Sequence, residues 1–310
     1  MDNKLPKVAV IMSTYNGEKY LREQIDSILA QKDVDIYLYI RDDGSKDKTV
    51  EIIKQYVENF QDKVTLIKGT NLGYKKSFMD CLMKSSSDCD YYAFSDQDDV
   101  WQEEKCIEAI KKIENQNNIP ALYCCSPTIC DENLQNQKIN DLTGGSNTLE
   151  GYWTRSRLPG CCMVFNNELY KMATKISLDD LSVVAHDTAI ASIAYAFGSV
   201  YIDSNSYMLH RRLNTSVTTG GKGFFNRLKT EYRIIFKSKD YYLTMAKFLN
   251  DYANKNKCKV KEEYDDFIST ILNYKKNMKD RFKLLFNKKM KCGSFIADME
   301  IKIRIMIGNY

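Results

Sequence analysis

Strands, polar loops and helices alternate over the first 115 residues, and this pattern limits the possible fold more than any other feature of the sequence. Short runs of β-forming residues end in polar turns, and apolar residues at helical spacing follow each turn. Because parallel strands are usually joined by a crossover helix, the alternation predicts a parallel α/β sheet with helices on both faces. We expect the strands at 7–12, 35–41, 63–67 and 91–95.

The segments between these strands carry apolar residues every three or four positions, as amphipathic helices do. Such helices cover the sheet with their apolar faces. We expect these faces on Leu21, Ile25, Ile28 and Leu29 in the first helix, on Ile52, Ile53, Tyr56, Val57 and Phe60 in the second, and on Phe78, Cys81 and Leu82 in the third.

Each of the four predicted strands ends in a polar cluster. In parallel α/β sheets, ligands bind outside the carboxyl ends of the strands. Four clusters at one edge therefore predict a ligand site there. The clusters are Ser13–Gly17, Asp42–Ser45, Gly69–Gly73 and Asp96–Asp99.

Three carboxylates, Asp96, Asp98 and Asp99, follow the fourth strand in the stretch YYAFSDQDDVW. Mg²⁺ and Mn²⁺ prefer oxygen ligands, and Mg²⁺ commonly shares its coordination with substrate phosphates. We interpret these acids as a site for a metal bound to a nucleotide diphosphate. The alternative is a solvated acidic loop after a strand.

Two common nucleotide-binding motifs are absent from the sequence. A dinucleotide fold needs G-x-G-x-x-G after the first strand, where this chain has only Gly17, and no GxxxxGK[ST] motif occurs. The chain also has no run of about 18 apolar residues and no apolar signal-peptide core. Its ten cysteines lack CxxC and Cys/His metal spacings, which is typical of reduced, buried thiols and predicts a cytoplasmic location.

The net charge of +4 conceals an uneven distribution. Residues 222–310 hold 21 Lys and Arg against 10 Asp and Glu, which leaves 24 against 31 in residues 1–221. We therefore expect a catalytic domain at 1–221, with a nucleotide-binding half at 1–115 and an acceptor half at 116–221. A basic helical extension is expected at 222–310, after a glycine-rich linker at 220–223.

The ordered motifs of the chain resemble those of glycosyltransferase family 2, which has the GT-A fold. They are VAVIMSTYNG at 8–17, RDDGSKDKT at 41–49, NLGYKKSF at 71–78, FSDQDDVW at 94–101, LPGCCMVFN at 158–166 and AHDTAIASIAYAFG at 185–198. FSDQDDVW and HRRLNTSV at 210–217 are most similar to the rhamnosyltransferase-like branch that builds bacterial surface polysaccharides. The resemblance implies a Rossmann-like mixed α/β sheet flanked by helices.

The resemblance also implies an inverting, metal-dependent transferase that uses a dTDP- or UDP-sugar, with rhamnose as the suggested sugar. Asp43 matches the acid that binds the pyrimidine base, with Asp42 beside it, and Asp187 matches the catalytic base. A carboxylate is a natural acceptor for an imide N–H, and it can take the proton of an attacking hydroxyl. The other residues that the resemblance assigns to the nucleotide are Ser13, Thr14, Tyr15, Asn16, Lys76 and Asp96.

Mn²⁺ or Mg²⁺ is assigned by the same resemblance to Asp96 and Asp98, with Asp99 as a further candidate ligand. Relatives often carry a metal-binding histidine at the position of Leu213. Either His210 substitutes for it, or the acids, the diphosphate and water suffice. Arg211 and Arg212 are candidate diphosphate partners, with a solvated loop as the alternative.

Several assignments have structural alternatives. Asp42 and Asp43 could form an Asx turn and a helix N-cap. Asp187 could cap a helix at 188–197, and His186 could be a structural histidine. Tyr15 and Trp153 could be core aromatics.

The expected acceptor is a surface-polysaccharide or lipid-linked glycan. The basic, apolar tail that ends in FIADMEIKIRIMIGNY predicts either a peripheral position on the inner face of the cell membrane, or a helical cap or homodimer interface. Two alternative functions remain open. A sugar nucleotidyltransferase would want a Gly-rich basic loop after the first strand, and a nucleic-acid binder would want a recognition motif in the tail, so no nucleic-acid partner is expected.

Overall fold

The computed structural model describes residues 4–116, 118–154, 158–213, 240–291 and 294–310. The chain forms two compact units. The first comprises Met1–Leu142, Leu158–Ala194 and Gly198–Arg211, and the second comprises Thr143–Arg157, Tyr195–Phe197 and Arg212–Tyr310. The predicted boundary at 221/222 and the predicted linker at 220–223 lie outside the described residues.

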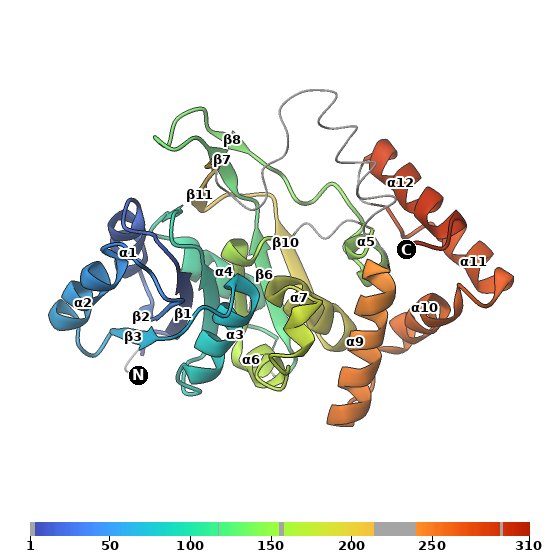
Figure 1. The fold of residues 1–310 in the computed structure, drawn as a ribbon, viewed down its shortest axis with the longest axis horizontal. Coiled ribbons are helices and arrows are strands. Elements are labelled where there is room, and N and C mark those ends of the chain that lie inside the picture. Colours follow the sequence, from blue (N-terminus) through green and yellow to red (C-terminus); the bar gives the residue numbers. More distant parts are fainter. Residues whose placement is uncertain (1–3, 117, 155–157, 214–239, 292–293) are drawn as a thin grey trace. The chain divides into compact units, whose positions relative to one another are not determined.

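A seven-stranded mixed sheet forms the core of the first unit (Figure 1). Its strand order is β10-β6-β9-β4-β1-β2-β3, and β9 runs antiparallel to both of its neighbours while the other pairs are parallel. The four predicted N-terminal strands are confirmed as parallel neighbours. The strands are β1 (Lys7–Thr14), β2 (Asp35–Asp42), β3 (Val64–Lys68), β4 (Tyr91–Ser95), β6 (Ala121–Cys125), β9 (Met163–Asn166) and β10 (Ser199–Asp203).

Strand β1 lies inside this sheet, between β4 and β2. Its residues Val8–Met12 are all fully buried, which explains why the run VAVIM is continuously apolar rather than alternating. Burial on both faces requires helices above and below the sheet. The helices of this unit are α1 (Leu21–Leu29), α2 (Thr49–Asn59), α3 (Tyr74–Lys84), α4 (Lys105–Ile113), α6 (Asn167–Ala173) and α7 (His186–Phe197), the last of which ends in the second unit.

The predicted apolar faces of the first three helices are largely confirmed. Leu21, Ile25 and Ile28 of α1 are fully buried, and so are Cys81 and Leu82 of α3. The prediction for Phe60 is wrong. Helix α2 ends at Asn59, and the Phe60 side chain after it is exposed.

A second, four-stranded sheet has the order β5-β11-β7-β8. In it, β5 pairs antiparallel with β11, with Val100 opposite Leu209 and Trp101 opposite Met208. This pairing brings the loop after β4 to the strand that carries His210. The strands are β5 (Val100–Trp101), β7 (Thr128–Cys130), β8 (Lys138–Ile139) and β11 (Met208–Arg211).

The second unit is helical. Trp153 is fully buried there, with its ring centroid 5.8 Å from that of Phe267, so it is a core aromatic as the alternative predicted. No helix in the described ranges has the length and hydropathy that crossing a bilayer requires. The helices are α5 (Leu149–Tyr152), α9 (Tyr241–Asn256), α10 (Glu262–Asn273), α11 (Met278–Leu285) and α12 (Phe295–Met306).

Candidate active site

The loops that follow β1, β2, β3 and β4 lie at one edge of the large sheet, because these four strands are parallel neighbours (Figure 1). This edge is the carboxyl edge, where α/β proteins bind their ligands. The four polar clusters predicted from the sequence therefore meet there. Hydrogen bonds between the loops tie them together.

The loop after β4, Asp96–Asp99, is called the acidic loop here. Its residue Gln97 joins it to the β1 loop through the side-chain amide. The Tyr15 backbone N–H donates to Gln97 Oε1 at 2.9 Å, and Gln97 Nε2 donates back to the Tyr15 carbonyl at 3.2 Å. A Cβ on Gly17 would lie only 2.4 Å from Gln97 Oε1, so a larger residue there would displace the Gln97 amide. The Tyr15 side chain is 45% exposed, which rules out the core-aromatic alternative and leaves its ring open to a ligand.

The β1 loop is also joined to the β2 loop. Thr14 Oγ1 donates to Asp42 Oδ1 at 3.2 Å, and the Asn16 backbone N–H donates to Ser45 Oγ at 2.9 Å. Asn16 itself adopts a left-handed backbone with φ of 50°, a conformation that asparagine tolerates well. Ser13 faces α3, where its hydroxyl hydrogen-bonds that of Ser77 at 2.5 Å.

Asp42 forms an Asx turn, as its structural alternative predicted. Its Oδ2 accepts hydrogen bonds from the backbone N–H groups of Gly44 and Ser45, at 3.1 and 3.0 Å. The N-cap alternative is wrong. Helix α2 begins only at Thr49, and its preceding residue, Lys48, makes no side-chain cap.

Asp43 is buried and connects the loops after β2 and β3. Its Oδ1 accepts from Arg41 Nη1 at 2.5 Å and from the Leu72 backbone N–H at 2.8 Å, while Oδ2 accepts from the Gly73 backbone N–H at 2.9 Å. A carboxylate has about four lone-pair sites, so Oδ2 retains capacity for one more donor.

Sequence reasoning missed the role of Arg41. Its guanidinium is almost fully buried and contacts both Asp43 and Asp80, the latter through Nε at 2.6 Å. Burial alone would raise the pKa of Asp80, but hydrogen bonds from Lys84 and Arg41 lower it below the ordinary value. Arg41 therefore holds the Asp43 carboxylate in place through a buried ion pair. The sequence did carry a signal for this contact, because the basic residue Arg41 directly precedes the acidic pair Asp42 and Asp43.

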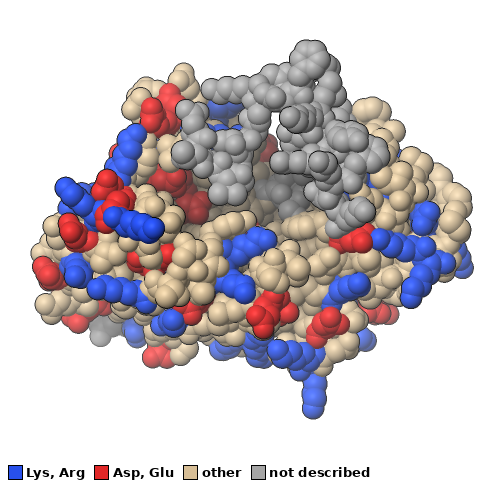
Figure 2. Space-filling view, in the orientation of Figure 1, with Lys and Arg blue, Asp and Glu red and all other residues tan. Residues whose placement is uncertain are grey.

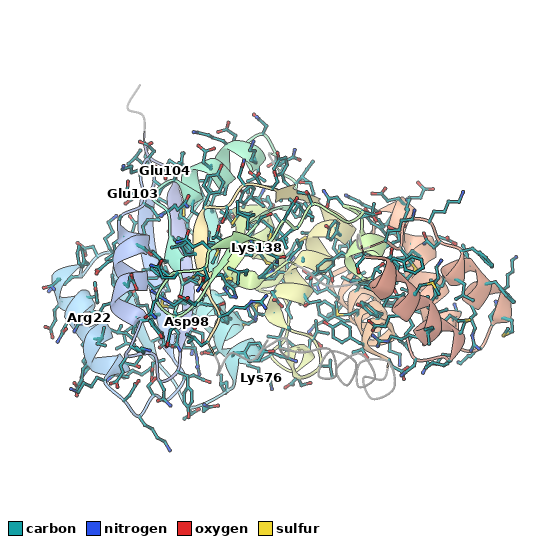
Figure 3. All side chains as sticks on the ribbon, turned by 90° about the horizontal axis from the view of Figure 1, so that it is seen from above. Arg22, Lys76, Asp98, Glu103, Glu104 and Lys138 are labelled. Atoms are coloured by element: carbon teal, nitrogen blue, oxygen red, sulfur yellow. The ribbon has the colours of Figure 1, made fainter. Side chains whose placement is uncertain are left out.

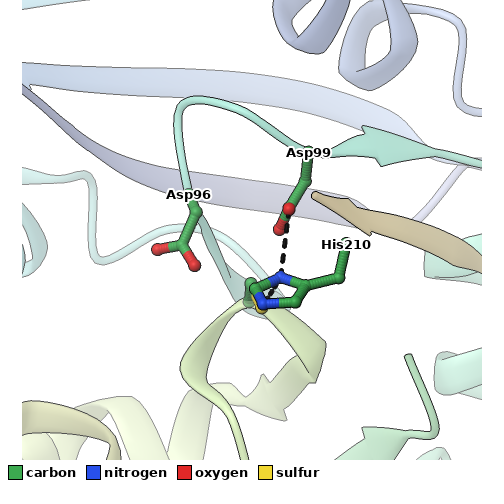
Figure 4. Close-up of side chains that lie close together, drawn as sticks. Asp96, Asp99 and His210 are labelled. Atoms are coloured by element: carbon green, nitrogen blue, oxygen red, sulfur yellow. Dashed lines mark hydrogen bonds and ion pairs between the residues drawn. The ribbon is translucent and has the colours of Figure 1, made fainter. Parts of the chain in front are cut away.

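Asp96, Asp99, Cys161 and His210 form a compact group of possible ligands in the acidic loop and around it (Figure 4). One ligand atom from each lies within 4.8 Å of the other three. His210 Nδ1 is 3.1 Å from Asp99 Oδ1 and 3.7 Å from Cys161 Sγ. His210 thus does reach the acids, while sequence reasoning missed Cys161 because its spacing from His210 matches no metal motif.

Negative charge is concentrated in this group. Burial and the neighbouring Cys161, Asp99 and Asp98 raise the pKa of Asp96 well above its ordinary value. Burial and Asp99 raise the pKa of Asp98 to about 6. Although burial alone would lower it, Cys161 and Asp99 raise the pKa of His210. A bound divalent cation would offset the mutual repulsion of these groups.

The Oδ2 atom of Asp99 is fully buried and has no hydrogen-bond partner in the part of the chain that the structure describes. Buried carboxylate oxygens are normally satisfied, and an orphaned one commonly indicates an ion or a water. Together with the imidazole and the second carboxylate, this atom makes the residues fit a divalent metal.

Asp98 lies outside the four-residue group, and its position after β4 is labelled in Figure 3. Its backbone carbonyl accepts from Arg211 Nη1 at 2.8 Å. Arg211 is buried and also pairs with Glu23 and donates to the Glu132 carbonyl, so both predictions for Arg211, diphosphate partner and solvated loop, are wrong. Arg211 instead holds the acidic loop in place. Lys76, also labelled, lies in the first turn of α3.

Asp187 lies in the first turn of α7 and is half-buried. The N-cap alternative for it is wrong, because α7 begins at His186 and its cap position is Ala185. Its neighbour His186 is buried, with its ring stacked on that of Phe78 at 4.3 Å, as expected of a structural histidine. Burial lowers the pKa of His186.

Gly160 connects Asp187 to the metal-ligand group. A Cβ on Gly160 would lie 3.0 Å from His186 Nε2 and 3.4 Å from the Asp187 Cβ. The next residue is Cys161, one of the four possible ligands. The short 3₁₀ turn Gly160–Cys162 therefore packs against the proposed base at one residue and faces the acids at the next.

The family model described as Glycosyl transferase family 2 matches residues 9–172 of the chain. The chain belongs to glycosyltransferase family 2. The dTDP-rhamnosyl transferase RfbG of Shigella flexneri is 30% identical over 209 residues, which cover 65% of this chain and 71% of RfbG. The rhamnosyltransferase-like resemblance predicted from the sequence is thereby confirmed.

Solved glycosyltransferase structures share the fold of this family 2 chain. S. aureus TarS 1–349 in complex with UDP-GlcNAc superposes with a TM-score of 0.58 at 17% identity, over 91% of this chain and 77% of TarS. The mannosyltransferase PcManGT from Pyrobaculum calidifontis, in complex with GDP-Man and Mn²⁺, gives 0.53 at 16% identity, over 98% and 81%. The predicted GT-A fold is confirmed.

Proposed function

We propose that this glycosyltransferase is inverting and metal-dependent, and that it moves a sugar from a nucleotide diphosphate to a glycan acceptor. The supporting observation is the turn at Gly160–Cys162, which packs against Asp187 at Gly160 and joins Asp96, Asp99 and His210 at Cys161. The Asp187 Oδ1 atom accepts from the Thr188 backbone N–H at 2.6 Å and from its hydroxyl at 3.2 Å, and the carboxylate keeps further lone pairs for a proton. A base beside a cation site would serve a single-displacement transfer.

The nucleotide is proposed to bind along the carboxyl edge of β1–β4. The exposed ring of Tyr15 offers a stacking surface, and Asp43 Oδ2 offers an acceptor for an imide N–H of the base. The loops on this edge are held in shape by polar contacts: Thr14 and Asn16 bond to the β2 loop, Ser13 bonds to α3, and Asp42 accepts from its own turn. Lys76 is proposed to contact the diphosphate with its ammonium group.

In the mechanism that we propose, Asp187 accepts the proton of the acceptor hydroxyl as that oxygen attacks the anomeric carbon. The attack and the departure of the nucleotide diphosphate take place in one displacement, so the anomeric configuration inverts and no covalent nucleophile is needed. Asp96, Asp99 and His210 would hold a divalent cation, with Asp98 beside them. Such a cation supplies Lewis-acid neutralisation of the leaving diphosphate.

The donor is proposed to be dTDP-rhamnose, because RfbG is a dTDP-rhamnosyl transferase. A panel of dTDP-, UDP- and GDP-sugars, assayed with Mn²⁺ or Mg²⁺ for donor hydrolysis and thermal stabilisation, tests this proposal. Preferential turnover of dTDP-rhamnose supports it, and turnover of another donor alone overturns the rhamnose assignment. Release of pyrophosphate from a nucleoside triphosphate would favour the nucleotidyltransferase alternative.

The acceptor is proposed to be a surface-polysaccharide intermediate on a lipid carrier, reached at the cytoplasmic face of the membrane. Support comes from α11 and the residue that caps it, because Met278, Phe282 and Phe286 recur every fourth residue and are 58%, 52% and 77% exposed. Lysines accompany this apolar face, and Figure 2 shows Lys and Arg side chains beside uncharged surface over α11 and α12. Exposed aromatics flanked by lysines suit the surface of an anionic bilayer.

A further inference from the structure

The Cys161 thiol faces the acids rather than the hydrophobic core. Its Sγ atom lies 3.7 Å from His210 Nδ1, and it belongs to the group in which four ligand atoms fall within 4.8 Å of one another. The Sγ atom of the adjacent Cys162 lies 3.6 Å from Met208 Sδ and is outside this group. Of these two neighbouring thiols, only Cys161 shares the group with Asp96 and Asp99.

Two hydrogen bonds fix the backbone of the turn that carries Cys161. Lys105, fully buried, donates through Nζ to the Cys161 carbonyl at 2.6 Å, and its ammonium lies 3.5 Å from the centroid of the Trp101 ring. The 3₁₀ turn is closed by the Cys162 backbone N–H, which donates to the Pro159 carbonyl at 3.0 Å. These bonds fix the backbone that carries the thiol, and the 3.7 Å contact with His210 places its sulfur in the site.

The four side chains offer two carboxylate oxygens, an imidazole nitrogen and a sulfur. Around a tetrahedral ion with bonds of about 2.0–2.3 Å, neighbouring ligand atoms lie about 3.3–3.8 Å apart. The contacts of His210 with Asp99 and Cys161, at 3.1 and 3.7 Å, are already close to that spacing. Thiolate ligands favour Zn²⁺ over Mg²⁺ or Mn²⁺, which prefer oxygen.

We propose that Cys161 is a metal ligand, and that the site binds a thiophilic divalent ion such as Zn²⁺ through Asp96, Asp99, His210 and the Cys161 thiolate. On binding, the S–H bond of Cys161 breaks, a sulfur–metal bond forms, and the proton leaves to solvent. The inference rests on the proposed metal site but is independent of sugar transfer, since it concerns the ligand set alone.

Cobalt titration of the reduced, metal-free 310-residue chain tests the proposal, because Co²⁺ bound to a thiolate gives an ultraviolet charge-transfer band. We expect the band to saturate at one equivalent, to disappear when Zn²⁺ is added, and to be lost in Cys161→Ser. Cys162→Ser is the matched control and retains the band. A missing band in the wild type, or a band that persists in Cys161→Ser, overturns the proposal.

X-ray absorption of the Zn²⁺-loaded wild type decides the question even if Cys161→Ser does not fold. One sulfur at about 2.3 Å from zinc is expected, and a first coordination sphere of nitrogen and oxygen alone overturns the proposal. Both measurements are made on protein and metal alone, without a sugar nucleotide. A positive result here with no sugar transfer would therefore count against the proposed function and leave the thiolate ligand standing.

Discussion

His210 Nδ1 lies 3.1 Å from Asp99 Oδ1, although the two residues come from distant parts of the sequence. The imidazole is partly exposed and the carboxylate is fully buried, so the pair reaches from the surface to the buried side of the acidic loop. The other carboxylate oxygen, Oδ2, has no hydrogen-bond partner within the described ranges. This pair is the most informative part of the site for a metal-binding test.

Asp99→Asn is expected to remove the stabilisation of the protein by nucleotide together with Mn²⁺. Bound ligand at about 100 times its dissociation constant adds about 2.7 kcal/mol to the free energy of unfolding. Thermal shift with dTDP or UDP, with and without Mn²⁺, measures the effect. Asp251→Asn, on the exposed face of α9, is the control. An unchanged metal-dependent shift in Asp99→Asn would refute the metal assignment.

Asp187→Asn is expected to lower the rate of sugar transfer by about 10²- to 10⁴-fold, because the amide cannot accept the hydroxyl proton. Donor binding should be unchanged, since the proposed nucleotide residues lie elsewhere. Transfer assays and donor-binding calorimetry on the same preparation separate the two effects. A variant that transfers sugar at the wild-type rate would eliminate Asp187 as the base.

Gly17→Ala should displace the Gln97 amide from Tyr15, because the new methyl group would lie only 2.4 Å from Gln97 Oε1. Loss of the two hydrogen bonds costs about 1 kcal/mol each in the free energy of unfolding, which urea titration measures. The same change in a Gln97→Ala background should cost much less, as expected of coupled residues. Gly144→Ala is the control, since no atom lies within 4 Å of its added Cβ. Equal costs in both backgrounds would contradict the Gln97 contact.

The ion pairs of Asp80 with Lys84 and Arg41 predict a pH dependence of stability. The folded-state pKa of Asp80 is lowered, so its contribution is present above the ordinary carboxyl pKa of about 3.9 and is lost as pH falls through the folded value. Asp80→Asn should therefore be less stable by about 1–3 kcal/mol at neutral pH and approach the wild type in acid. Urea titrations from pH 3 to 7 test this, with exposed Asp88→Asn as the control. A constant difference across that range would contradict the pairing.

Phe282→Ser combined with Phe286→Ser is expected to reduce co-sedimentation with anionic vesicles, because each aromatic removed takes apolar area out of the bilayer contact. Wild-type binding should weaken as salt rises, since the flanking lysines are screened. Phe60→Ser, which alters an exposed phenylalanine of the first unit, should bind as the wild type does. Absence of wild-type binding at low salt would exclude the membrane role.

Much of the fold could be predicted because its signals are local. The runs at 7–12 and 91–95 are apolar, their polar turns follow directly, and parallel pairing then places those turns together. The start of α2 was harder, because Asp42 bonds its own turn instead of capping the helix. The local sequence DDGS suits both an Asx turn and a helix N-cap.

The rest of the site depends on contacts between distant segments. Cys161 looks like one more buried thiol in sequence, and only the packing of its turn against β11 places its sulfur beside His210. Arg211 looks like a candidate phosphate ligand, yet its guanidinium is occupied by Glu23 and by the Asp98 and Glu132 carbonyls. Sequence spacing alone does not predict which partners a buried arginine binds.

The pairing of Val100 with Leu209 has a consequence for how such enzymes diverge. Main-chain hydrogen bonds hold the acidic loop against β11, and these bonds do not depend on which side chains the strands carry. Ligands can therefore be exchanged one at a time on an unchanged frame. At the metal site that we propose, the imidazole at 210 or the thiol at 161 could be exchanged for another ligand, which would change the preferred ion while the strand pairing stays the same.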